Sequence, residues 1–424
     1  MATTLLIAIF VIGYCAITLE HTLKVNKAAP ALLTGIACWV VYILSNGNGH
    51  HVLHELEAHM GELSGILFFL LGAMVIVELI DAHDGFDIIT SRIKLQGKVR
   101  LMWLICLVTF FLSAILDNLT TTIVMISVLR KLIPLKSERL FFVGLTVIAA
   151  NAGGAWSPMG DVTTTMLWIG GQITVLPIIK GLFLPSLACV VVPLAIISFQ
   201  MRGVVEPVAQ REVRVAPSSA LERRTVFGLG IGVLFMVPAF KTVTGLPPFM
   251  GMLFGLGLMW VLTEFIHGDK NEAEKGVLSV NHAIRKIDTP SILFFLGILL
   301  AISALESTGL LSQVAKWLEH AVGNIVLLGL TIGLLSAIID NVPLVAAAQG
   351  MYTLNHFPID SFFWQFLAYC AGTGGSALIV GSAAGVAAMG LEQVNFFWYF
   401  KKMSFLAVAG YLAGAGVYLV QRMM

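Results

Sequence analysis

Two pairs of adjacent aspartate and asparagine residues lie where few polar side chains are expected. Asp117-Asn118 lies within "AILDNLTTTIV", and Asp340-Asn341 lies within the similar stretch "AIIDNVPLVAA". At membrane depth a carboxylate costs about 2.5 to 3.5 kcal/mol, so an acidic residue there marks a functional site by default. Burial favours a neutralised carboxylate, and either a bound cation or a proton can neutralise it. A site that holds one or the other, but never both, predicts exchange of a cation for protons.

Each Asp-Asn pair is followed by a glycine-rich stretch inside an apolar segment. The stretch "NAGGAWSPMGD" covers residues 151–161, and "GTGGSALIVGS" covers residues 372–382. Glycine and proline interrupt helices and free backbone carbonyl and amide groups. At membrane depth such irregular backbone is tolerated only where it is buried in protein or lines a cavity. Freed carbonyls are hard oxygen ligands that suit a small alkali cation, so we predict two broken membrane helices beside the Asp-Asn pairs.

The candidate ligands in these stretches are carboxylates, amides and hydroxyls. Asp117 and Asp340 are the expected shared ligands for cation and proton, and Asn118 and Asn341 are expected as neutral oxygen ligands that organise the tips. Na⁺ would be held by these four residues. Asp161 is a third candidate carboxylate. The remaining candidates, all in the broken helices, are Asn151, Ser157, Thr164, Thr373, Ser376 and Ser382.

Simpler interpretations exist for each feature. Aspartate and asparagine start helices by accepting backbone N–H bonds, but capping needs one polar residue and does not explain a carboxylate in both copies. Glycine pairs in membrane helices are more often packing contacts than ligand sites, but the neighbouring hydroxyls favour a site here. Glu78, Asp81 and Glu306, near the ends of apolar runs, are accessory candidates for proton access, and a purely interfacial role is equally open.

The composition indicates the kind of protein that positions these residues. Hydrophobic residues make up 58% of the chain, charged residues make up 12%, and the mean hydropathy is +0.92. Soluble domains carry about 25% charged residues, and apolar runs of about 20 residues, enough to cross a lipid bilayer, recur along the chain. We therefore predict an all-α polytopic membrane protein. The net charge of +1 argues against a nucleic-acid partner. The five cysteines lack metal-site spacing, and no cofactor is expected.

Three motifs recur in the second half of the chain at nearly constant offsets. Such weak internal symmetry is typical of secondary transporters. The offsets are 292 − 66 = 226 for "ILFFLLG" and "ILFFLGI", 340 − 117 = 223 for the Asp-Asn pairs, and 374 − 153 = 221 for the Gly-Gly pairs. Under the last offset Asp161 aligns with Ser382, so the first repeat contributes an extra carboxylate.

The distribution of lysine and arginine predicts which way each repeat faces. Basic residues precede the first Asp-Asn segment from Arg92 to Arg100 and follow it from Arg130 to Arg139. Because cytoplasmic loops are rich in Lys and Arg, both ends of this segment are predicted to be cytoplasmic. Its two arms, each of roughly 15 residues, are shorter than a span, so we predict a re-entrant helical hairpin. No Lys or Arg lies between Trp317 and Phe400, which predicts a second hairpin that enters from the opposite face. The two halves then form an inverted repeat.

Five segments follow from these patterns. They are N-terminal scaffold helices (1–60), repeat 1 with a scaffold helix, hairpin 1 and a broken helix (61–201), a cytoplasmic linker (202–225), linking transmembrane helices (226–286), and repeat 2 with a scaffold helix, hairpin 2, a broken helix and the last helix (287–424). Four histidines interleaved with glutamates predict a solvated external loop; they are His50, His51, His54 and His59.

Long ordered motifs give the chain a family resemblance. They are "LFFLLGAMVIVE", "LDNLTTTIVM", "NAGGAWSPMGDVTTTMLW", "LFFLGILLAISALESTGLL", "IIDNVPLVAA" and "GTGGSALIVGSAAG". With them the chain resembles the NhaD-type sodium/proton antiporters of the ion transporter superfamily, which are related to sodium-coupled dicarboxylate and citrate transporters. The resemblance implies a scaffold domain that forms a homodimer and a transport domain that moves as an elevator, in a bacterial inner membrane.

The leading functional prediction is a secondary-active antiporter that exports cytoplasmic Na⁺ or Li⁺ in exchange for H⁺. The alternative is a sodium-coupled carboxylate symporter. In the dicarboxylate relatives the tips resemble Ser-Asn-Thr, whereas two Asp-Asn tips would repel a dianion by about 4 kcal/mol per charge pair at 4 Å. No cationic side chain is expected near the tips to offset this repulsion. A membrane enzyme is not expected, because no GxSxG or HExxH motif is present.

Overall fold

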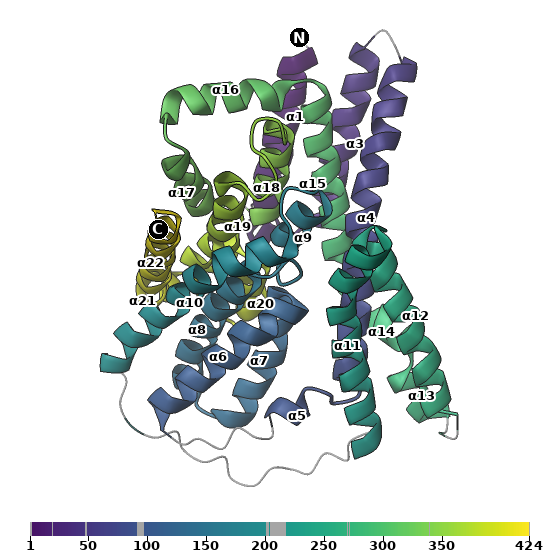
Figure 1. Cartoon of the computed structure of the whole chain (residues 1–424), viewed down its shortest axis with the longest axis vertical. Coiled ribbons are helices and arrows are strands. Elements are labelled where there is room, and N and C mark those ends of the chain that lie inside the picture. Colours follow the sequence, from purple (N-terminus) through teal and green to yellow (C-terminus); the bar gives the residue numbers. More distant parts are fainter. Residues whose placement is uncertain are drawn as a thin grey trace.

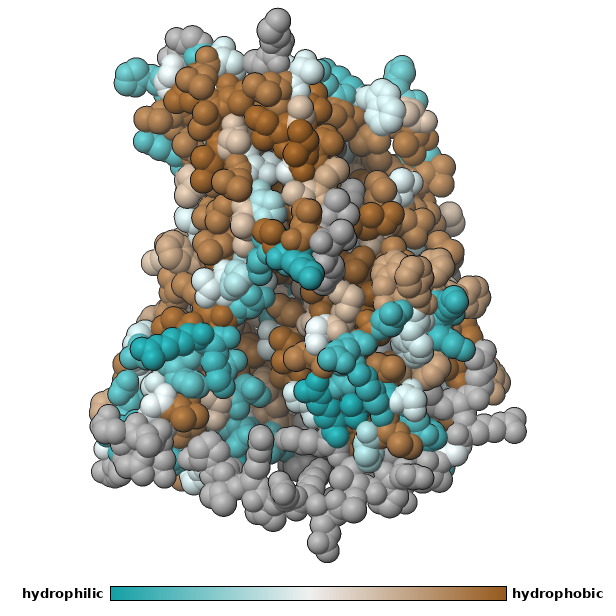
Figure 2. Space-filling view, turned by 180° about the vertical axis from the view of Figure 1, so that it is seen from behind, coloured by the Kyte–Doolittle hydropathy of each residue, from teal (hydrophilic) through white to brown (hydrophobic). Residues whose placement is uncertain are grey.

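The structure is a bundle of helices. The computed structural model describes residues 2–18, 20–46, 49–90, 97–200, 203, 218–268, 270, 272–338 and 340–423, and within them every element is helical. Eight described helices are long and apolar enough to cross a membrane, or nine if the bent pair α16 (Leu310–Val322) and α17 (Ile325–Leu335) is one span. In Figure 2 hydrophobic side chains cover most of one face, and hydrophilic side chains gather toward its lower end. The prediction of an all-α polytopic membrane protein is confirmed.

The candidate spans are distributed along the whole chain. They fall in α3 (Ala28–Ser45), α4 (Gly49–Ala82), α6 (Lys98–Leu116), α10 (Val175–Gln200), α11 (Ala220–Thr244), α12 (Pro248–Ile266), α15 (Thr289–Ser307) and α22 (Ser404–Met423). The other helices outside the two motif regions are α1 (Ala2–Thr18), α2 (Glu20–Leu23), α5 (Asp87–Thr90), α13 (Glu272–Leu278), α14 (Val280–Lys286) and α21 (Phe396–Lys402).

Each Asp-Asn pair separates two consecutive helices. Asp117 lies between α6 and α7 (Asn118–Leu132), and Asp340 lies between α17 and α18 (Asn341–Met351). Figure 1 shows α6 and α7 in the lower half of the molecule and α17 and α18 in the upper half. The arms are unequal, because α6 has 19 residues, α7 has 15, and α17 and α18 have 11 each. At 19 residues α6 is longer than the predicted arm and long enough to span, so arm length alone does not establish re-entry.

Both glycine-rich stretches interrupt a helix where the sequence predicts a break. In the first, α8 (Lys136–Ala155) ends before "WSPMGD", and α9 (Val162–Ile169) begins after it. In the second, α19 (Phe362–Gly374) is followed by two short 3₁₀ turns, η1 (Gly375–Ala377) and η2 (Ile379–Gly381), and then by α20 (Ala383–Glu392). The residues that follow the breaks, Asp161 and Ser382, have nearly the same extended backbone, with φ of −148° in each.

Two groups of helices stand side by side in Figure 1, with α3, α4, α11 and α12 on the right and α6, α8, α10 and α22 on the left. In the right-hand group α15 packs directly on α3, because a Cβ on Gly297 would lie 2.4 Å from the carbonyl carbon of Ala31. In the left-hand group Glu392, at the end of α20, is 2% exposed and accepts from Arg130 of α7 and Arg139 of α8. This ion-pair cluster fastens hairpin 1 to both broken helices.

Glycines let each broken helix approach the first arm of its own hairpin. A Cβ on Gly153 would lie 2.2 Å from the Phe110 carbonyl oxygen, and a Cβ on Gly374 would lie 1.9 Å from the Gly333 carbonyl oxygen. The two contacts are related by offsets of 374 − 153 = 221 and 333 − 110 = 223. Both offsets also relate the sequence motifs.

A pair of serine hydrogen bonds repeats the same relation. Ser113 Oγ donates to the Ala150 carbonyl at 2.6 Å. Ser336 Oγ lies 3.3 Å from the Ala371 carbonyl and shares its hydrogen with the Gly333 carbonyl at 2.7 Å. The differences are again 336 − 113 = 223 and 371 − 150 = 221. Hairpin arm and broken helix are therefore joined by equivalent contacts in the two halves.

The histidine-rich stretch is helical, and the prediction of a loop there was wrong. It forms the first turns of α4, in which Val52, Leu56, Met60 and Leu63 recur at helical spacing. The four histidines remain exposed or half-buried on the opposite faces of that helix. Helix α4 therefore runs without a break through the segment boundary drawn at residue 60.

The predicted linker, residues 202–225, falls mostly outside the described residues, since residues 204–217 are not described. Its last residues already belong to α11. Ser219 caps this helix by accepting from the Glu222 N–H at 3.2 Å, and the Glu222 side chain accepts from the Ser219 N–H at 3.1 Å. This reciprocal capping box fixes the start of α11 before residue 225.

Candidate cation site

One carboxylate, that of Asp161, lies where both Asp-Asn motifs meet the first broken helix. Asp161 is the N-cap residue of α9 and is 2% exposed. Asn118 Nδ2 donates to Asp161 Oδ1 at 3.0 Å, and Asn341 Nδ2 donates to Asp161 Oδ2 at 3.3 Å. The Thr163 hydroxyl also donates to Oδ2. The Asp161 carboxylate therefore accepts hydrogen bonds from the first residues of α7 and α18 at once.

Asn151 extends this cluster into the second broken helix. Its Oδ1 accepts from Asn118 Nδ2 at 3.0 Å, and its Nδ2 donates to Ser376 Oγ and Ser382 Oγ, each at 2.8 Å. Buried polar groups need such partners, and a fully bonded network specifies one arrangement of the helices that carry it. We call the connected residues the Asp161 network; they are Asn118, Asn151, Asp161, Thr163, Asn341, Ser376 and Ser382.

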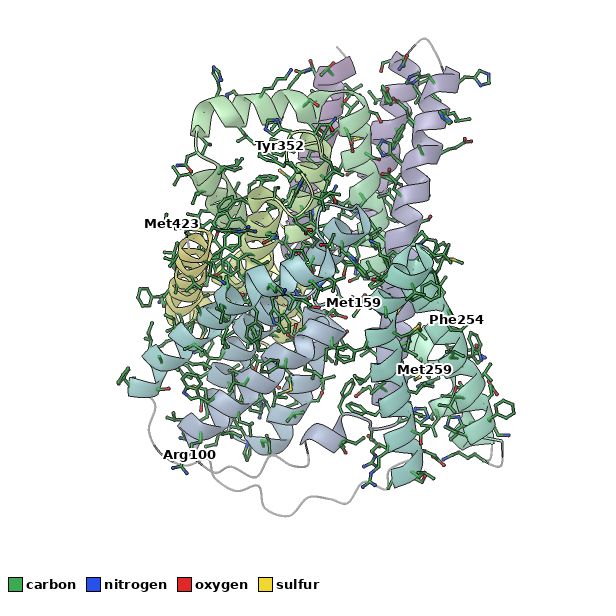
Figure 3. All side chains as sticks on the ribbon, in the orientation of Figure 1. Arg100, Met159, Phe254, Met259, Tyr352 and Met423 are labelled. Carbon is green, nitrogen blue, oxygen red and sulfur yellow. The ribbon has the colours of Figure 1, made fainter. Side chains whose placement is uncertain are left out.

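Asp117 lies beside the network as the N-cap residue of α7. Both of its carboxylate oxygens accept from Thr120, Oδ1 from the backbone N–H and Oδ2 from the hydroxyl, each at 2.8 Å. Asp117 and Asp161 line one small cavity of about 20 Å³, which is large enough for one water molecule or a small ion. Met159, labelled in Figure 3 where the two groups of helices meet, lines the same cavity.

The backbone of Asp117 adopts a conformation that is almost confined to glycine. Its φ is 87° and its ψ is 160°, and a non-glycine residue held in this region costs about 1 to 3 kcal/mol. The strain places the carboxylate at the tip while its side chain caps α7. Strain of this kind persists where the surrounding structure and the function require that side chain.

The strain predicts an ordering of variants by stability. Asp117→Gly and Asp117→Ala both remove the carboxylate and the bonds to Thr120, but only glycine relieves the backbone. We expect Asp117→Gly to be more stable than Asp117→Ala by about 1 to 3 kcal/mol, helped by the better capping of glycine. Thermal unfolding in detergent measures the difference. An alanine variant as stable as the glycine variant would show that the backbone at Asp117 is not strained.

Asp340 lies in a different environment from Asp117. Its Oδ1 accepts from the Val342 N–H at 3.3 Å, and its Oδ2 accepts from Lys27 Nζ at 3.1 Å. The expectation that no cationic side chain lies near the tips was therefore wrong. The structure brings Asn341 into the Asp161 network but turns the adjacent carboxylate of Asp340 toward Lys27.

Three other predicted ligands hydrogen-bond to backbone close to them in the chain. Thr164 Oγ1 donates to the Asp161 carbonyl at 2.9 Å, and Thr373 Oγ1 donates to the Tyr369 carbonyl at 2.6 Å. Ser157 Oγ accepts from the Met159 N–H at 3.3 Å. All three are buried. Their hydroxyls bond to backbone around the two helix breaks.

The three accessory candidates have different surroundings. Glu78 pairs with Lys286 Nζ at 3.4 Å. Asp81 is exposed at the end of α4. The Glu306 carboxylate lies against Gly350 of α18.

The sequence of the chain is similar to those of known transporters. A family model described as citrate transporter matches residues 7–372. Sodium/proton antiporter 2 of Arabidopsis thaliana is 50% identical over 413 residues, which cover 97% of this chain and 98% of that protein. Sodium/proton antiporter 1 of the same plant is 51% identical, over 97% of this chain and 71% of its own length. The Na⁺/H⁺ antiporter NhaD of Vibrio cholerae is 29% identical, over 97% of this chain and 90% of that protein.

The chain belongs to the NhaD-type sodium/proton antiporter family. The resemblance drawn from the motifs is thereby confirmed, and the relatives are transporters rather than enzymes. In the run Thr163 to Thr165 the sequence predicts Thr164 as a ligand, whereas in the structure of this antiporter-family chain Thr163 donates to Asp161. The run alone does not show which hydroxyl reaches the carboxylate. A threonine two residues after an N-cap aspartate is the signal that could have identified it.

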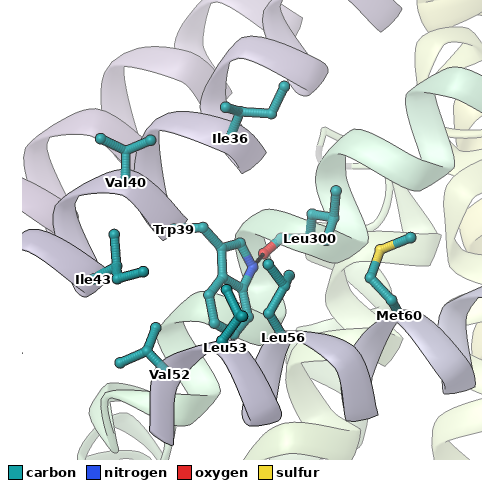
Figure 4. Close-up of a pocket in the computed structure, with 9 residues that line it drawn as sticks. All are labelled: Ile36, Trp39, Val40, Ile43, Val52, Leu53, Leu56, Met60 and Leu300. Atoms are coloured by element: carbon teal, nitrogen blue, oxygen red, sulfur yellow. Dashed lines mark hydrogen bonds between the residues drawn. The ribbon is translucent and has the colours of Figure 1, made fainter. Parts of the chain in front are cut away.

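A larger cavity in this antiporter-family chain lacks the groups that a cation needs. It measures about 350 Å³ and is lined only by apolar and aromatic side chains of α3, α4 and α15. Figure 4 shows Trp39 at its centre, with the indole N–H donating to the Leu300 carbonyl at 3.0 Å. Without a carboxylate or a free carbonyl this cavity offers no ligand set for Na⁺.

Proposed function

We propose that this chain is a secondary-active antiporter that exports cytoplasmic Na⁺, or Li⁺, in exchange for protons. The observation that carries the proposal is the Asp161 carboxylate, 2% exposed and bonded to asparagines from both hairpin tips. A carboxylate that is buried so deeply needs a neutralising partner, and a proton or a small cation can each be that partner. The sodium/proton antiporters of Arabidopsis thaliana and Vibrio cholerae support the same exchange.

The roles divide among carboxylates, amides and hydroxyls. Asp161 and Asp117, which line one cavity of about 20 Å³, are the proposed proton and Na⁺ ligands on the side of repeat 1, and Asp340 is the third carboxylate. Asn118 and Asn341 supply amide oxygens when their amides turn toward the ion. Na⁺ then replaces hydrogen-bond donors around Asp161 with its own charge. Cation and proton compete, because both neutralise the same carboxylates.

The proposed architecture is an inverted repeat with two re-entrant hairpins and two broken transmembrane helices. The equivalent glycine and serine contacts at offsets of 221 and 223 support the repeat. Lys98 and Arg100 at the start of α6 and Arg130 in the last turn of α7 support the cytoplasmic assignment of the lower end, where Figure 3 labels Arg100. The left-hand group of helices is the proposed transport domain of an elevator, and the right-hand group is the scaffold of a homodimer in a cell membrane.

Transport by purified protein tests the proposal. Proteoliposomes loaded with NaCl or LiCl and a pH-sensitive dye are diluted into buffer without either cation at alkaline pH. We expect the interior to acidify as Na⁺ or Li⁺ leaves and protons enter. Choline-loaded vesicles and protein-free liposomes are the controls. An unchanged internal pH with both cations would refute antiport.

The same vesicles test the alternative, a sodium-coupled carboxylate symporter. External citrate and succinate are added with a Na⁺ gradient directed inward, and uptake of labelled carboxylate is measured. We expect no uptake above that of protein-free liposomes, because Lys27 already pairs with Asp340 and leaves no unpaired positive charge at that tip. Carboxylate uptake that depends on Na⁺ would favour the symporter.

A further inference from the structure

Lys27 is placed between the N-terminal helices and the tip of hairpin 2. It is the N-cap residue of α3, and its Nζ lies 3.1 Å from Asp340 Oδ2. The two side chains are only 21% and 18% exposed. The ammonium also lies 4.2 Å from the centroid of the Phe294 ring on α15. A half-buried ammonium with a carboxylate and an aromatic face is a built contact, and it differs from a solvated surface pair.

The ammonium is held from the right-hand group of helices. The Lys27 backbone N–H donates to Glu20 Oε1 at 3.1 Å, and Phe294 belongs to α15, which packs on α3 through Gly35 and Gly297. Asp340, in contrast, adjoins Asn341, which bonds to Asp161. The Lys27–Asp340 pair therefore joins the scaffold to the tip whose next residue touches the central carboxylate.

A cavity reaches the Lys27 side of this ion pair. It measures about 400 Å³ and is lined by Lys27, Glu20 and Asp288 on one side and by Leu119 of α7 and residues of α20 on the other. Its acidic side chains are engaged, since Glu20 accepts from the Lys27 N–H and Asp288 caps α15 by accepting from the Ser291 N–H at 3.3 Å. Lys27 lines this cavity and Asp340 does not, so a cation in the cavity faces the Lys27 ammonium rather than the Asp340 carboxylate.

We propose that Lys27 is the resident counter-ion of Asp340, which a transported cation must displace. The proposal rests on the antiport function proposed above. An ammonium and a Na⁺ ion on the same carboxylate repel each other. Na⁺ therefore binds Asp340 only after the Lys27–Asp340 ion pair has broken. Lys27 is thus a positioning residue that acts through Asp340. Its ion pair with Asp340 lowers the apparent affinity of the protein for Na⁺. After Na⁺ leaves, Lys27 again neutralises the Asp340 carboxylate and holds it next to the scaffold.

Kinetics of Lys27 variants in the NaCl-loaded vesicles test the proposal. Lys27→Met keeps an apolar stem over the Phe294 ring and removes only the charge. We expect its KM for Na⁺ to fall about 5- to 10-fold, whereas Lys27→Arg, which keeps the charge, stays within about 2-fold of the parent. Lys24→Gln is the matched control, because Lys24 is an exposed lysine in the same loop, and it should leave KM unchanged.

Binding without transport gives a second readout. Na⁺ that binds the folded state raises Tm in proportion to the logarithm of its concentration over Kd. The Na⁺-dependent rise in Tm should be larger in Lys27→Met than in the parent. When Asp340→Asn is added to both proteins, this difference in the rise of Tm should vanish. A KM and a Tm shift that are unaltered by Lys27→Met, or altered equally by Met and Arg, would overturn the counter-ion role. Loss of exchange in the parent protein would overturn the proposed function instead.

Discussion

Replacement of Asp161 by asparagine is expected to abolish Na⁺/H⁺ exchange while the protein remains folded. The attraction between a carboxylate and a cation at 4 Å is about 4 kcal/mol at an effective dielectric of 20, which corresponds to roughly a thousandfold in binding. Asparagine is close to aspartate in shape, and its amide oxygen still accepts from Asn118 or Asn341. Removing a buried charge also removes its desolvation penalty. We therefore expect transport to fall by about 10³ and Tm to stay level or rise.

Glu57→Gln is the control for Asp161→Asn, because it removes an exposed carboxylate from the N-terminal part of α4. It should leave both transport and Tm unchanged. The vesicle assay with NaCl and LiCl measures exchange, and thermal unfolding in detergent measures the folded state. Exchange at the parental rate in correctly folded Asp161→Asn would remove Asp161 from the mechanism.

Replacement of Gly374 by alanine is expected to prevent proper packing of the second broken helix. The added Cβ would lie 1.9 Å from the Gly333 carbonyl oxygen and 2.5 Å from its carbonyl carbon, and both belong to backbone. Overpacking of this kind costs about 1 to 3 kcal/mol and sometimes more. An alanine in place of a helical glycine would otherwise stabilise by about 1 kcal/mol. The close contact therefore reverses the sign of the substitution.

Gly416→Ala is the matched control, because a Cβ at this position in α22 meets nothing within 4 Å. The yield of monodisperse protein and the Tm should fall for Gly374→Ala and hold or rise for Gly416→Ala. Gly153→Ala, at the equivalent position of repeat 1, should behave like Gly374→Ala. A Tm of Gly374→Ala at or above the parent value would show that the α17–α19 contact can relax.

The local features of the site could be predicted from sequence because each has a local cause. Asp-Asn at a helix start and Gly-Gly with a nearby proline determine backbone over a few residues, and the helices end and restart at those motifs. Which of the three carboxylates lies at the centre of the hydrogen-bond network could not be predicted in the same way. Asp161 was the third candidate carboxylate, yet it receives bonds from Asn118 and Asn341, because convergence depends on how distant helices pack.

The Lys27–Asp340 pair shows what sequence patterns leave out. The two residues are 313 positions apart, and no motif surrounds Lys27 in the loop before α3. Loop lysines are usually solvated, so spacing gives no reason to bring this one to a hairpin tip. The prediction of a loop for the histidine-rich stretch was wrong for another reason. His and Glu density suggests a loop, but Val52, Leu56 and Met60 recur at helical spacing, and that period decides the structure.

The unequal ends of the two broken helices have a consequence for the driving force. Ser382 carries a hydroxyl where the equivalent Asp161 carries a charge, so the Asp161 network contains a single titratable carboxylate. One Na⁺ exchanged for one proton on that carboxylate moves no net charge, and only the difference in pH drives it. Transmembrane voltage contributes about 2.3 kcal/mol per elementary charge per 100 mV to any cycle with unequal charges. Net charge moved in each cycle therefore requires a second proton carrier, and Asp117, which shares the small cavity with Asp161, is positioned to be that carrier.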